Sequence, residues 1–318
     1  MILGFIALMI TFTLSFLIYP RFIAYLKATT AQQEVSEYAL DEFKEKEKTV
    51  TFGGVIFVVM PILVVFTLFL LKLNMKLILL ILVFASYGLL GFLDDYKIIK
   101  EGKNDGLSAK TKLLIQFVIA AAFYLIYINI GGNNTINIPI VNVTLNLGYF
   151  YFPFVVFMFA AYSNAFNLTD GMDGLAGGTS ILAFIPFVIF AYQSQMELFV
   201  FLLAVIGGLL AFLIYNYSPA KIFMGDVGSL ALGALFAVSS VYLNMEVLSL
   251  IIGGVFVYET VTVVIQQVYF RFTRKRIFRY TPIHYSFTMR GWEEITVVHF
   301  FWILGLVCAV VGLWIGLI

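Results

Sequence analysis

The 318 residues are 62% hydrophobic and 12% charged, with a mean hydropathy of +1.01 and a formal net charge of +1. Soluble domains carry about 25% charged residues, so a soluble core could not bury this much apolar surface, and lipid must be the solvent for most of it. The balanced charge argues against a nucleic-acid partner, and a single cysteine, Cys308, excludes a disulfide framework and a CxxC metal site.

Ten apolar stretches approach the length of a membrane-spanning helix, which needs about 20 residues. They are 2–20, 52–71, 77–93, 113–130, 149–167, 177–192, 198–215, 228–245, 247–270 and 295–317. The sixth is short and contains Pro186, which predicts a kinked or re-entrant helix. Residues 131–148 alternate apolar and polar side chains and predict a small β-hairpin on the membrane surface. We expect an all-α polytopic membrane protein in which 1–318 form one domain.

The charged residues predict the orientation of these helices. If the first helix starts outside, both termini lie outside and five loops share the inner side: 21–51, 94–112, 168–176, 216–227 and 271–294. Those loops hold 17 of the 19 lysines and arginines, and only Lys72 and Lys76 lie opposite. The positive-inside rule makes this side cytoplasmic. Fifteen of the 18 acids lie there as well, which predicts that the chemistry takes place on this face.

The third stretch ends in two adjacent acids, Asp94 and Asp95, within Gly91-Phe-Leu-Asp-Asp-Tyr-Lys97. Adjacent carboxylates repel each other, so the pair is costly unless a cation lies nearby. An Mg²⁺ ion or neighbouring lysines would supply that positive charge. The alternative interpretation is a solvated helix end beside Lys97 and Lys100.

A second acidic motif follows the fifth stretch, between Asn167 and Gly174. Asp170 and Asp173 are three residues apart and share one face if the segment is helical. The flanking glycines allow sharp turns and a close approach of the backbone to a ligand. The loop contains no lysine or arginine, so its carboxylates favour a metal or the hydrogen-bond donors of a substrate. The alternative is a polar turn that caps two helices.

A third motif, Phe223-Met-Gly-Asp226-Val-Gly228, places one acid between two glycines at the start of the eighth stretch. Such an acid suits a magnesium ligand, because Mg²⁺ is bound by a few carboxylates together with the phosphate oxygens of a substrate. Phe223 could stack on a base. The alternative is an aromatic side chain that faces lipid or the core.

The loop 271–294 is rich in lysine and arginine, as expected of a segment that binds the anionic head groups of membrane lipids. It also contains His284, one of two histidines, where an imidazole could bind a diphosphate or transfer a proton. Glu259 lies inside the ninth stretch. An acid within a span is either functional or a hydrogen-bonding partner of a neighbouring helix, and the sequence favours neither.

Taken together, these motifs resemble those of the phospho-N-acetylmuramoyl-pentapeptide transferases, a family of polyprenyl-phosphate sugar-1-phosphate transferases. The similarity covers nearly the whole chain and is densest in 91–97, 163–176, 219–230 and 275–294. It implies transfer of phospho-MurNAc-pentapeptide from UDP-MurNAc-pentapeptide to undecaprenyl phosphate, giving lipid I and UMP in peptidoglycan biosynthesis. It also implies an Mg²⁺ cofactor, a homodimer, and a multi-pass location in the bacterial plasma membrane with the active site on the cytoplasmic face.

The resemblance also assigns roles to single residues. Asp94, Asp95 and Asp226 match essential acids of the family, with Asp226 the magnesium ligand, and His284 matches a catalytic position. The positions that match substrate-binding residues are Lys46, Lys112, Asn167, Asp170, Asp173, Asn216, Phe223 and Gln266. Within that set, the resemblance implies that Phe223 stacks on uracil and that Lys112 binds a phosphate. It also implies that the nucleoside pocket is formed by Asn167, Asp170 and Asp173.

Two segments depart from the family pattern. The family's Pro-Ile-His-His-His-Phe-Glu reads Pro282-Ile-His-Tyr-Ser-Phe-Thr288 here, and its Thr-Pro-Thr-Met-Gly-Gly reads Thr49-Val-Thr-Phe-Gly-Gly54. Any role of the family's second histidine must therefore pass to His284 or be dispensable.

Two other activities are weighed against this one. A UDP-N-acetylhexosamine-1-phosphate transferase would change only the sugar, and the segment Gly291-Trp-Glu-Glu294 favours the muramyl substrate. A transporter or lipid flippase would bind its substrate near the bilayer midplane, whereas most acids here lie at one surface. For the transferase itself, the sequence does not separate direct displacement by the lipid phosphate from a two-step route through a phosphorylated aspartate.

Overall fold

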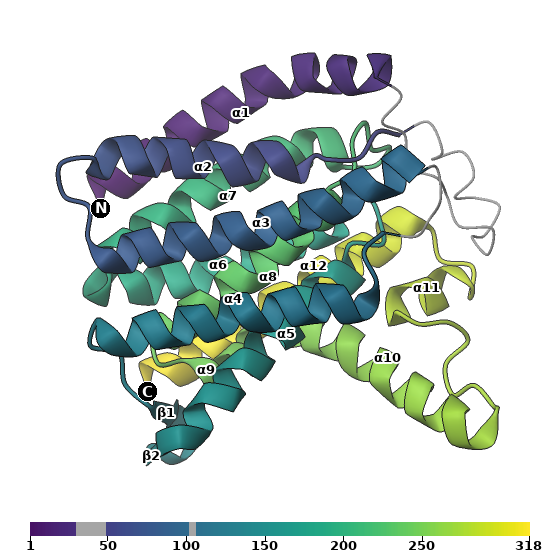
Figure 1. Ribbon diagram of the computed structural model, residues 1–318. Coiled ribbons are helices and arrows are strands. Elements are labelled where there is room, and N and C mark those ends of the chain that lie inside the picture. Colours follow the sequence, from purple (N-terminus) through teal and green to yellow (C-terminus); the bar gives the residue numbers. More distant parts are fainter. Residues whose placement is uncertain (30–48, 102–105) are drawn as a thin grey trace.

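The computed structural model describes residues 1–29, 49–101 and 106–318, and these ranges are almost entirely helical (Figure 1). The α-helices are α1 (Ile2–Ala28), α2 (Gly54–Phe69), α3 (Met75–Glu101), α4 (Ala109–Asn129), α5 (Tyr151–Thr169), α6 (Leu175–Ser194), α7 (Met196–Asn216), α8 (Gly225–Tyr242), α9 (Glu246–Ile252), α10 (Gly254–Thr273), α11 (Ile283–Thr288) and α12 (Glu294–Leu317). The all-α fold class is therefore confirmed for the described residues.

Each of the ten predicted apolar stretches contains a helix, but fewer than ten helices meet the requirements of a membrane span. By length and composition, eight described helices could cross a membrane, and nine if the bent pair α9 and α10 counts as one. The helix that falls short is α2, an apolar helix of 16 residues. The described helices thus show eight or nine candidate spans of the ten predicted, and α2 is the short apolar helix left over.

The predicted ninth stretch is a broken helix. α9 ends at Ile252, α10 begins at Gly254, and the two helices differ in direction by 86°. The break directs α10 away from the bundle, towards α11 (Figure 1). The sixth stretch, predicted as a kinked or re-entrant helix, is the continuous helix α6 of 20 residues, which contains Pro186 and is long enough to span.

Glycines allow the helices around α8 to pack with their backbones in contact. A Cβ atom at Gly91 of α3 would overlap the backbone of Asp226 and Val227, and one at Gly54 of α2 would overlap Gly228. Close backbone approach of this kind is the usual way in which helices associate in lipid, where water no longer drives apolar surfaces together. The contact at Gly91 brings the acidic end of α3 against the first turn of α8.

The predicted hairpin is confirmed. β1 (Thr135–Ile138) pairs antiparallel with β2 (Val143–Asn146), and Thr135 lies opposite Asn146. The connection is a short 3-10 helix, Pro139–Val141, followed by Asn142 with a φ of 49°. The hairpin lies at the same end of the molecule as both chain termini, whereas α11 lies at the opposite end (Figure 1).

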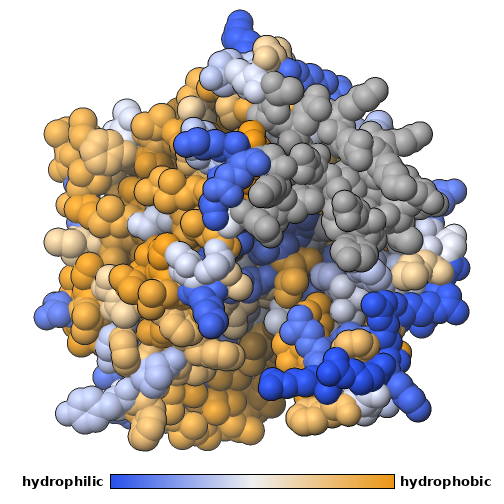
Figure 2. Space-filling view, turned by 45° about the vertical axis from the view of Figure 1, so that its right-hand side comes forward, coloured by the Kyte–Doolittle hydropathy of each residue, from blue (hydrophilic) through white to orange (hydrophobic). Residues whose placement is uncertain are grey.

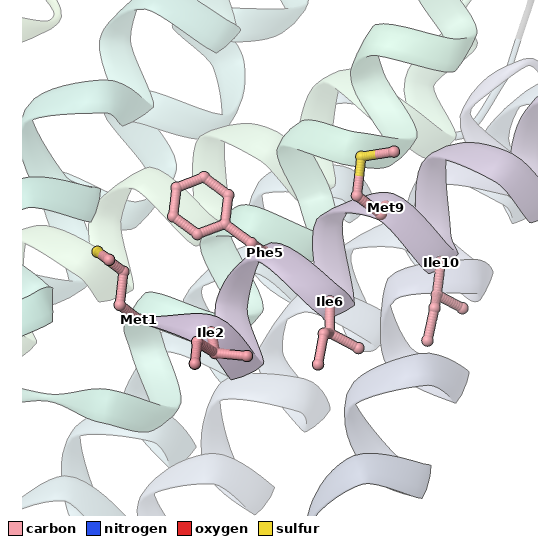
Figure 3. Close-up of a pocket in the computed structure, with 6 residues that line it drawn as sticks. All are labelled: Met1, Ile2, Phe5, Ile6, Met9 and Ile10. Carbon is pink, nitrogen blue, oxygen red and sulfur yellow. The ribbon is translucent and has the colours of Figure 1, made fainter.

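The surface of the molecule is divided into polar and apolar parts. Figure 2, which brings the α11 end forward, shows hydrophilic residues gathered there beside broad hydrophobic surfaces. A shallow hollow along α1 is lined only by apolar side chains, namely Met1, Ile2, Phe5, Ile6, Met9 and Ile10 (Figure 3). Its side chains offer no group that binds phosphate, so the hollow is not a candidate for the chemistry that the acidic motifs predict.

Candidate active site

Three aspartates from two helices form one cluster at the polar end. Asp94 and Asp95 lie in the last turns of α3, and Asp226 is the second residue of α8. One carboxylate oxygen from each lies within 4.8 Å of the other two. These residues lie up to 132 positions apart in the sequence, and the Gly91 contact between α3 and α8 brings them together.

Lys112 of α4 connects two of the three acids. Its Nζ donates to Asp94 Oδ2 and to Asp226 Oδ2, both at 2.8 Å. The second oxygen of Asp94 accepts the backbone N–H of Leu107 at 2.7 Å. The second oxygen of Asp226 accepts the side-chain amide of Asn167 at 2.6 Å. The predicted association of the acids with a lysine is therefore present, and Lys112 supplies it from a separate helix.

Asp95 lies beneath the turn that begins α8. Its Oδ2 accepts the backbone N–H of Val227 at 3.4 Å, and only 7% of the residue is exposed. Gly225 has a φ of 74°, and a side chain there would overlap the Asp95 carboxylate. A glycine is thus required at this position both for the turn and for the space that Asp95 occupies.

The donor set of this cluster fits a divalent cation. Three carboxylates face one ammonium group, so the cluster has an excess of negative charge, and carboxylate oxygens are the protein ligands that Mg²⁺ prefers. Asp94, Asp95 and Asp226 are the residues that would hold the ion.

Asp170 lies beside the cluster, at the C-terminal end of α5. The Gly225 backbone N–H donates to its carboxylate. Burial, and then the negative charges of Asp226 and Asp173, raise the pKa of Asp170 to about 8 from an ordinary value of 3.8. Asp170 is therefore an acid that binds a proton near neutral pH next to a cluster of negative charge.

Asp173 and Asn216 fasten two loops to each other. Asp173 Oδ2 accepts the backbone N–H of Ala220 at 3.0 Å, and its own N–H donates to Glu294 at 2.8 Å. Asn216 Oδ1 accepts the N–H of Gly174 at 3.0 Å, while its amide donates to the carbonyl of Ile222 at 2.9 Å. These contacts fix the loop after α5 against the loop before α8.

Phe223 is held by its backbone, and its side chain is partly exposed. Its N–H donates to Val50 and its carbonyl accepts from Gly53, both at 2.8 Å. Within the part of the chain that the structure describes, no other ring stacks on Phe223. The ring is therefore free to receive a planar ligand two residues before Gly225.

The remaining predicted site residues lie elsewhere. Gln266 of α10 accepts the N–H groups of Ile277 and Phe278, both at 3.0 Å, and so fastens the basic loop. His284 is fully buried in α11, and no hydrogen bond or ion pair among the described residues joins it to the aspartate cluster. Lys46 lies outside the described residues.

Sequence reasoning did not foresee three contacts at the site. Ser229 accepts the Asn167 amide at 3.0 Å, the Leu107 N–H binds Asp94, and Glu294 binds the Asp173 N–H. Ser229 follows Asp226 by three residues on α8, so the helical period could have indicated it. Leu107 contributes only its backbone N–H to the Asp94 contact, so its part in the site could not be read from its side chain.

Comparisons with known proteins agree with this site. The model of glycosyl transferase family 4 matches residues 75–244, which hold all three clustered aspartates and Lys112. The chain is therefore a membrane-embedded transferase of glycosyl transferase family 4.

Individual relatives show which family of transferases the chain belongs to. The phospho-N-acetylmuramoyl-pentapeptide-transferases of Bacillus licheniformis and Bacillus subtilis are each 42% identical over 307 residues, covering 96% of this chain and 95% of theirs. That of Oceanobacillus iheyensis is 41% identical over 322 residues, covering 98% of this chain and 97% of its own. The chain belongs to the phospho-N-acetylmuramoyl-pentapeptide-transferase family, which confirms the resemblance read from its motifs.

Proposed function

We propose that this protein transfers phospho-MurNAc-pentapeptide from UDP-MurNAc-pentapeptide to undecaprenyl phosphate, giving lipid I and UMP for peptidoglycan synthesis. The observation that carries the proposal is the Asp94, Asp95 and Asp226 cluster around Lys112, at helix ends where a lipid phosphate confined to the head-group plane can reach it. The near-full-length identity to transferases of that name supports the muramyl substrate over an N-acetylhexosamine, and it argues against transport as the main activity.

The reaction brings several negative charges together, so catalysis is mainly alignment and charge neutralisation. Asp94, Asp95 and Asp226 would hold Mg²⁺, which would supply positive charge for the diphosphate. Lys112 is placed to take a phosphate oxygen, because its ammonium group lies between Asp94 and Asp226. Phe223 receives the uracil ring, and Asn167 with Asp170 lines the nucleoside pocket. Asp173, Asn216 and Gln266 act on the substrate through the loops they fasten.

Asp95 is the residue we assign to the incoming lipid phosphate. Both oxygens of Asp94 are occupied, one by Lys112 and one by the Leu107 N–H. Asp95 makes no hydrogen bond to Lys112 among the described residues, and its carboxylate accepts the backbone N–H groups of Asp226 and Val227 at the start of α8. Because it is not neutralised by the lysine, we assign it to orient the phosphate or accept its proton in a direct displacement.

A detergent-solubilised assay tests this function. Lipid I and UMP should form from UDP-MurNAc-pentapeptide and undecaprenyl phosphate, and removal of Mg²⁺ by a chelator should stop the reaction until Mg²⁺ is restored. Turnover of a UDP-N-acetylhexosamine in place of the muramyl substrate would overturn the sugar assignment. Exchange of labelled UMP into the UDP-sugar without any lipid phosphate would overturn direct displacement and favour the phosphorylated aspartate.

The assigned face is the cytoplasmic one, and the protein is a homodimer in the plasma membrane. The 17 to 2 distribution of cations supports the orientation, and the dimer rests on the motif resemblance alone. In this arrangement α2 completes a tenth crossing as a short helix, which places both termini outside.

A further inference from the structure

Glu259 is a buried carboxylate that the aspartate cluster does not use. Its side chain is fully buried in α10, and each oxygen accepts one hydrogen bond. Oε2 accepts the backbone N–H of Ile283 at 2.8 Å, and Oε1 lies 3.1 Å from His284 Nδ1. Among the described residues, no lysine or arginine forms an ion pair with it. A buried carboxylate is costly unless it is hydrogen-bonded. The two hydrogen bonds that Glu259 accepts therefore attach the first turn of α11 to α10.

The bond to Glu259 also determines which nitrogen of His284 carries a proton. An ionised carboxylate only accepts hydrogen bonds, so the Nδ1 atom that faces it must be the donor. The other ring nitrogen, Nε2, is buried and has no hydrogen-bond partner among the described residues. The ring is therefore fixed in plane and in tautomer by one residue from another helix.

The free side of the His284 ring lies against Gly171. A Cβ atom at Gly171 would overlap Nε2, and it would also press on the Tyr285 hydroxyl. That hydroxyl donates to the Gly171 carbonyl at 2.8 Å. α11 thus contacts the loop after α5 twice, through the ring of one residue and the hydroxyl of the next.

These contacts form a continuous path from Glu259 to the aspartate cluster. α11 has only six residues, and a helix this short does not keep its position without tertiary contacts. Gly171 follows Asp170, whose carboxylate accepts the N–H of Gly225. The position of Asp170 at the cluster consequently depends on where α11 lies, and α11 is attached through Glu259.

We propose that Glu259 is a positioning residue for the nucleotide side of the reaction. It holds His284 with the proton on Nδ1 and seats α11 under Gly171. In doing so it sets the place of Asp170 in the nucleoside pocket. This inference rests on the proposed function only where Asp170 is assigned to that pocket; the histidine tautomer is a property of the protein alone.

The experiment uses Glu259→Gln in the full-length protein. The glutamine oxygen can still accept the Ile283 N–H, but its amide donates to Nδ1, so the imidazole proton moves to Nε2. The chain has only two histidines, and His299 bonds Tyr217 outside the site, so a His299→Gln background leaves one imidazole in a ¹⁵N spectrum. We expect a protonated Nδ1 with Glu259 and a protonated Nε2 with Gln.

The kinetic expectation separates positioning from a merely structural role. Glu259→Gln should raise the KM for the UDP-sugar about tenfold, as changes to residues behind a site commonly do, and leave the KM for undecaprenyl phosphate unchanged. Glu259→Asp should keep Nδ1 protonated and recover part of the affinity. A lower kcat with both KM values unchanged would mean fewer folded molecules and would overturn the proposal, as would Nε2 already protonated with Glu259 present.

Gly171→Ala displaces the same ring from its other side and carries the test if Glu259→Gln does not fold. An unchanged KM for the UDP-sugar in that variant overturns the proposal. If neither Glu259→Gln nor Gly171→Ala changes the KM for the UDP-sugar, Asp170→Asn shows which step of the inference is wrong. When Asp170→Asn also leaves that KM unchanged, the nucleoside pocket was wrongly assigned; when it raises the KM, Glu259 and Gly171 do not act through Asp170.

Discussion

Lys112 and Asn167 account for how three carboxylates share one small volume beside lipid. Between them they bind both oxygens of Asp226, and Lys112 also binds Asp94. Each of these hydrogen bonds involves a charged group, which makes it roughly twice as strong as a neutral one. The cluster is consequently arranged before any substrate arrives, and a change in one carboxylate should affect activity more than folding.

Asp226→Asn tests that expectation. Asparagine keeps the shape of the side chain and an oxygen for Lys112 or Asn167, so the protein should fold and insert as before. Because a charge at the centre of the cluster is lost, lipid I formation should fall at least about 100-fold. Glu101→Gln is the matched control, since Glu101 is an exposed acid of α3 whose ion-pair partner among the described residues is Lys97 at 4.0 Å. Comparable activity in the Asp226→Asn protein would remove Asp226 from the metal site.

In the metal-free protein, Asp170 makes the free energy of unfolding depend on pH, and the raised pKa fixes the direction of that dependence. Its pKa is about 8 when folded and near 3.8 when unfolded, so the folded state binds the extra proton between those values. The free energy of unfolding therefore falls as the pH rises through this window, and the loss is complete above a pH of about 8. Asp170→Asn cannot ionise and should escape this loss.

Thermal unfolding in detergent with a chelator measures the effect. The Tm of Asp170→Asn minus that of the natural sequence should increase between about pH 5 and pH 8.5. Taking the difference cancels other groups that titrate equally in both proteins. A difference that stays constant or shrinks would show that Asp170 is ionised in the folded protein.

At the scale of helices, one glycine contact determines whether the two halves of the site meet. Gly91 of α3 lies against the backbone of Asp226 and Val227 with no room for a methyl group. α3 also carries Asp94 and Asp95 about one turn further on. Any separation of α3 from α8 therefore moves the paired acids away from the third.

Gly91→Ala should lower kcat about tenfold or more, because displacements on the order of 1 Å at a catalytic site have effects of this size and larger. The matched control is Gly305→Ala in α12, where the nearest atoms to an added Cβ lie at 3.7 Å, an ordinary contact. The turnover of both variants, normalised to folded protein, checks the prediction. Equal turnover would mean that the contact at Gly91 does not set the geometry of the cluster.

At the scale of the whole molecule, the polar end and the hairpin end lie opposite each other. Both termini and the hairpin lie at one end, and α11 lies at the other (Figure 1). The aspartate cluster lies near the end of α3 that carries Lys97 and Lys100. The proposed orientation places the hairpin outside the cell and the cluster inside.

Labelling of single cysteines in intact cells decides the orientation. Cys308 is the only native cysteine, so Cys308→Ser gives a clean background. Thr144→Cys in the exposed hairpin should react with a membrane-impermeant maleimide, and Lys100→Cys at the exposed end of α3 should react only after the membrane is opened. The reverse pattern would place the active site on the outer face.

The sequence by itself determined the solvent, the fold class and the reaction class. A chain that is 62% hydrophobic must put most of its surface in lipid. Because charge is costly in lipid, most acids lie at helix ends and in loops, where their motifs can be recognised in the sequence. The hairpin was predictable for a similar reason, since alternation of side chains reports directly on a strand.

Only the tertiary structure decided which residues meet. The break of 86° between α9 and α10 depends on packing, and the apolar pattern of 247–270 continues through it unchanged. The pairing of Glu259 with His284, and of Lys112 with two aspartates, joins residues on different helices. Side-chain spacing describes one helix at a time, whereas these contacts depend on how separate helices pack, so no local pattern could have revealed them.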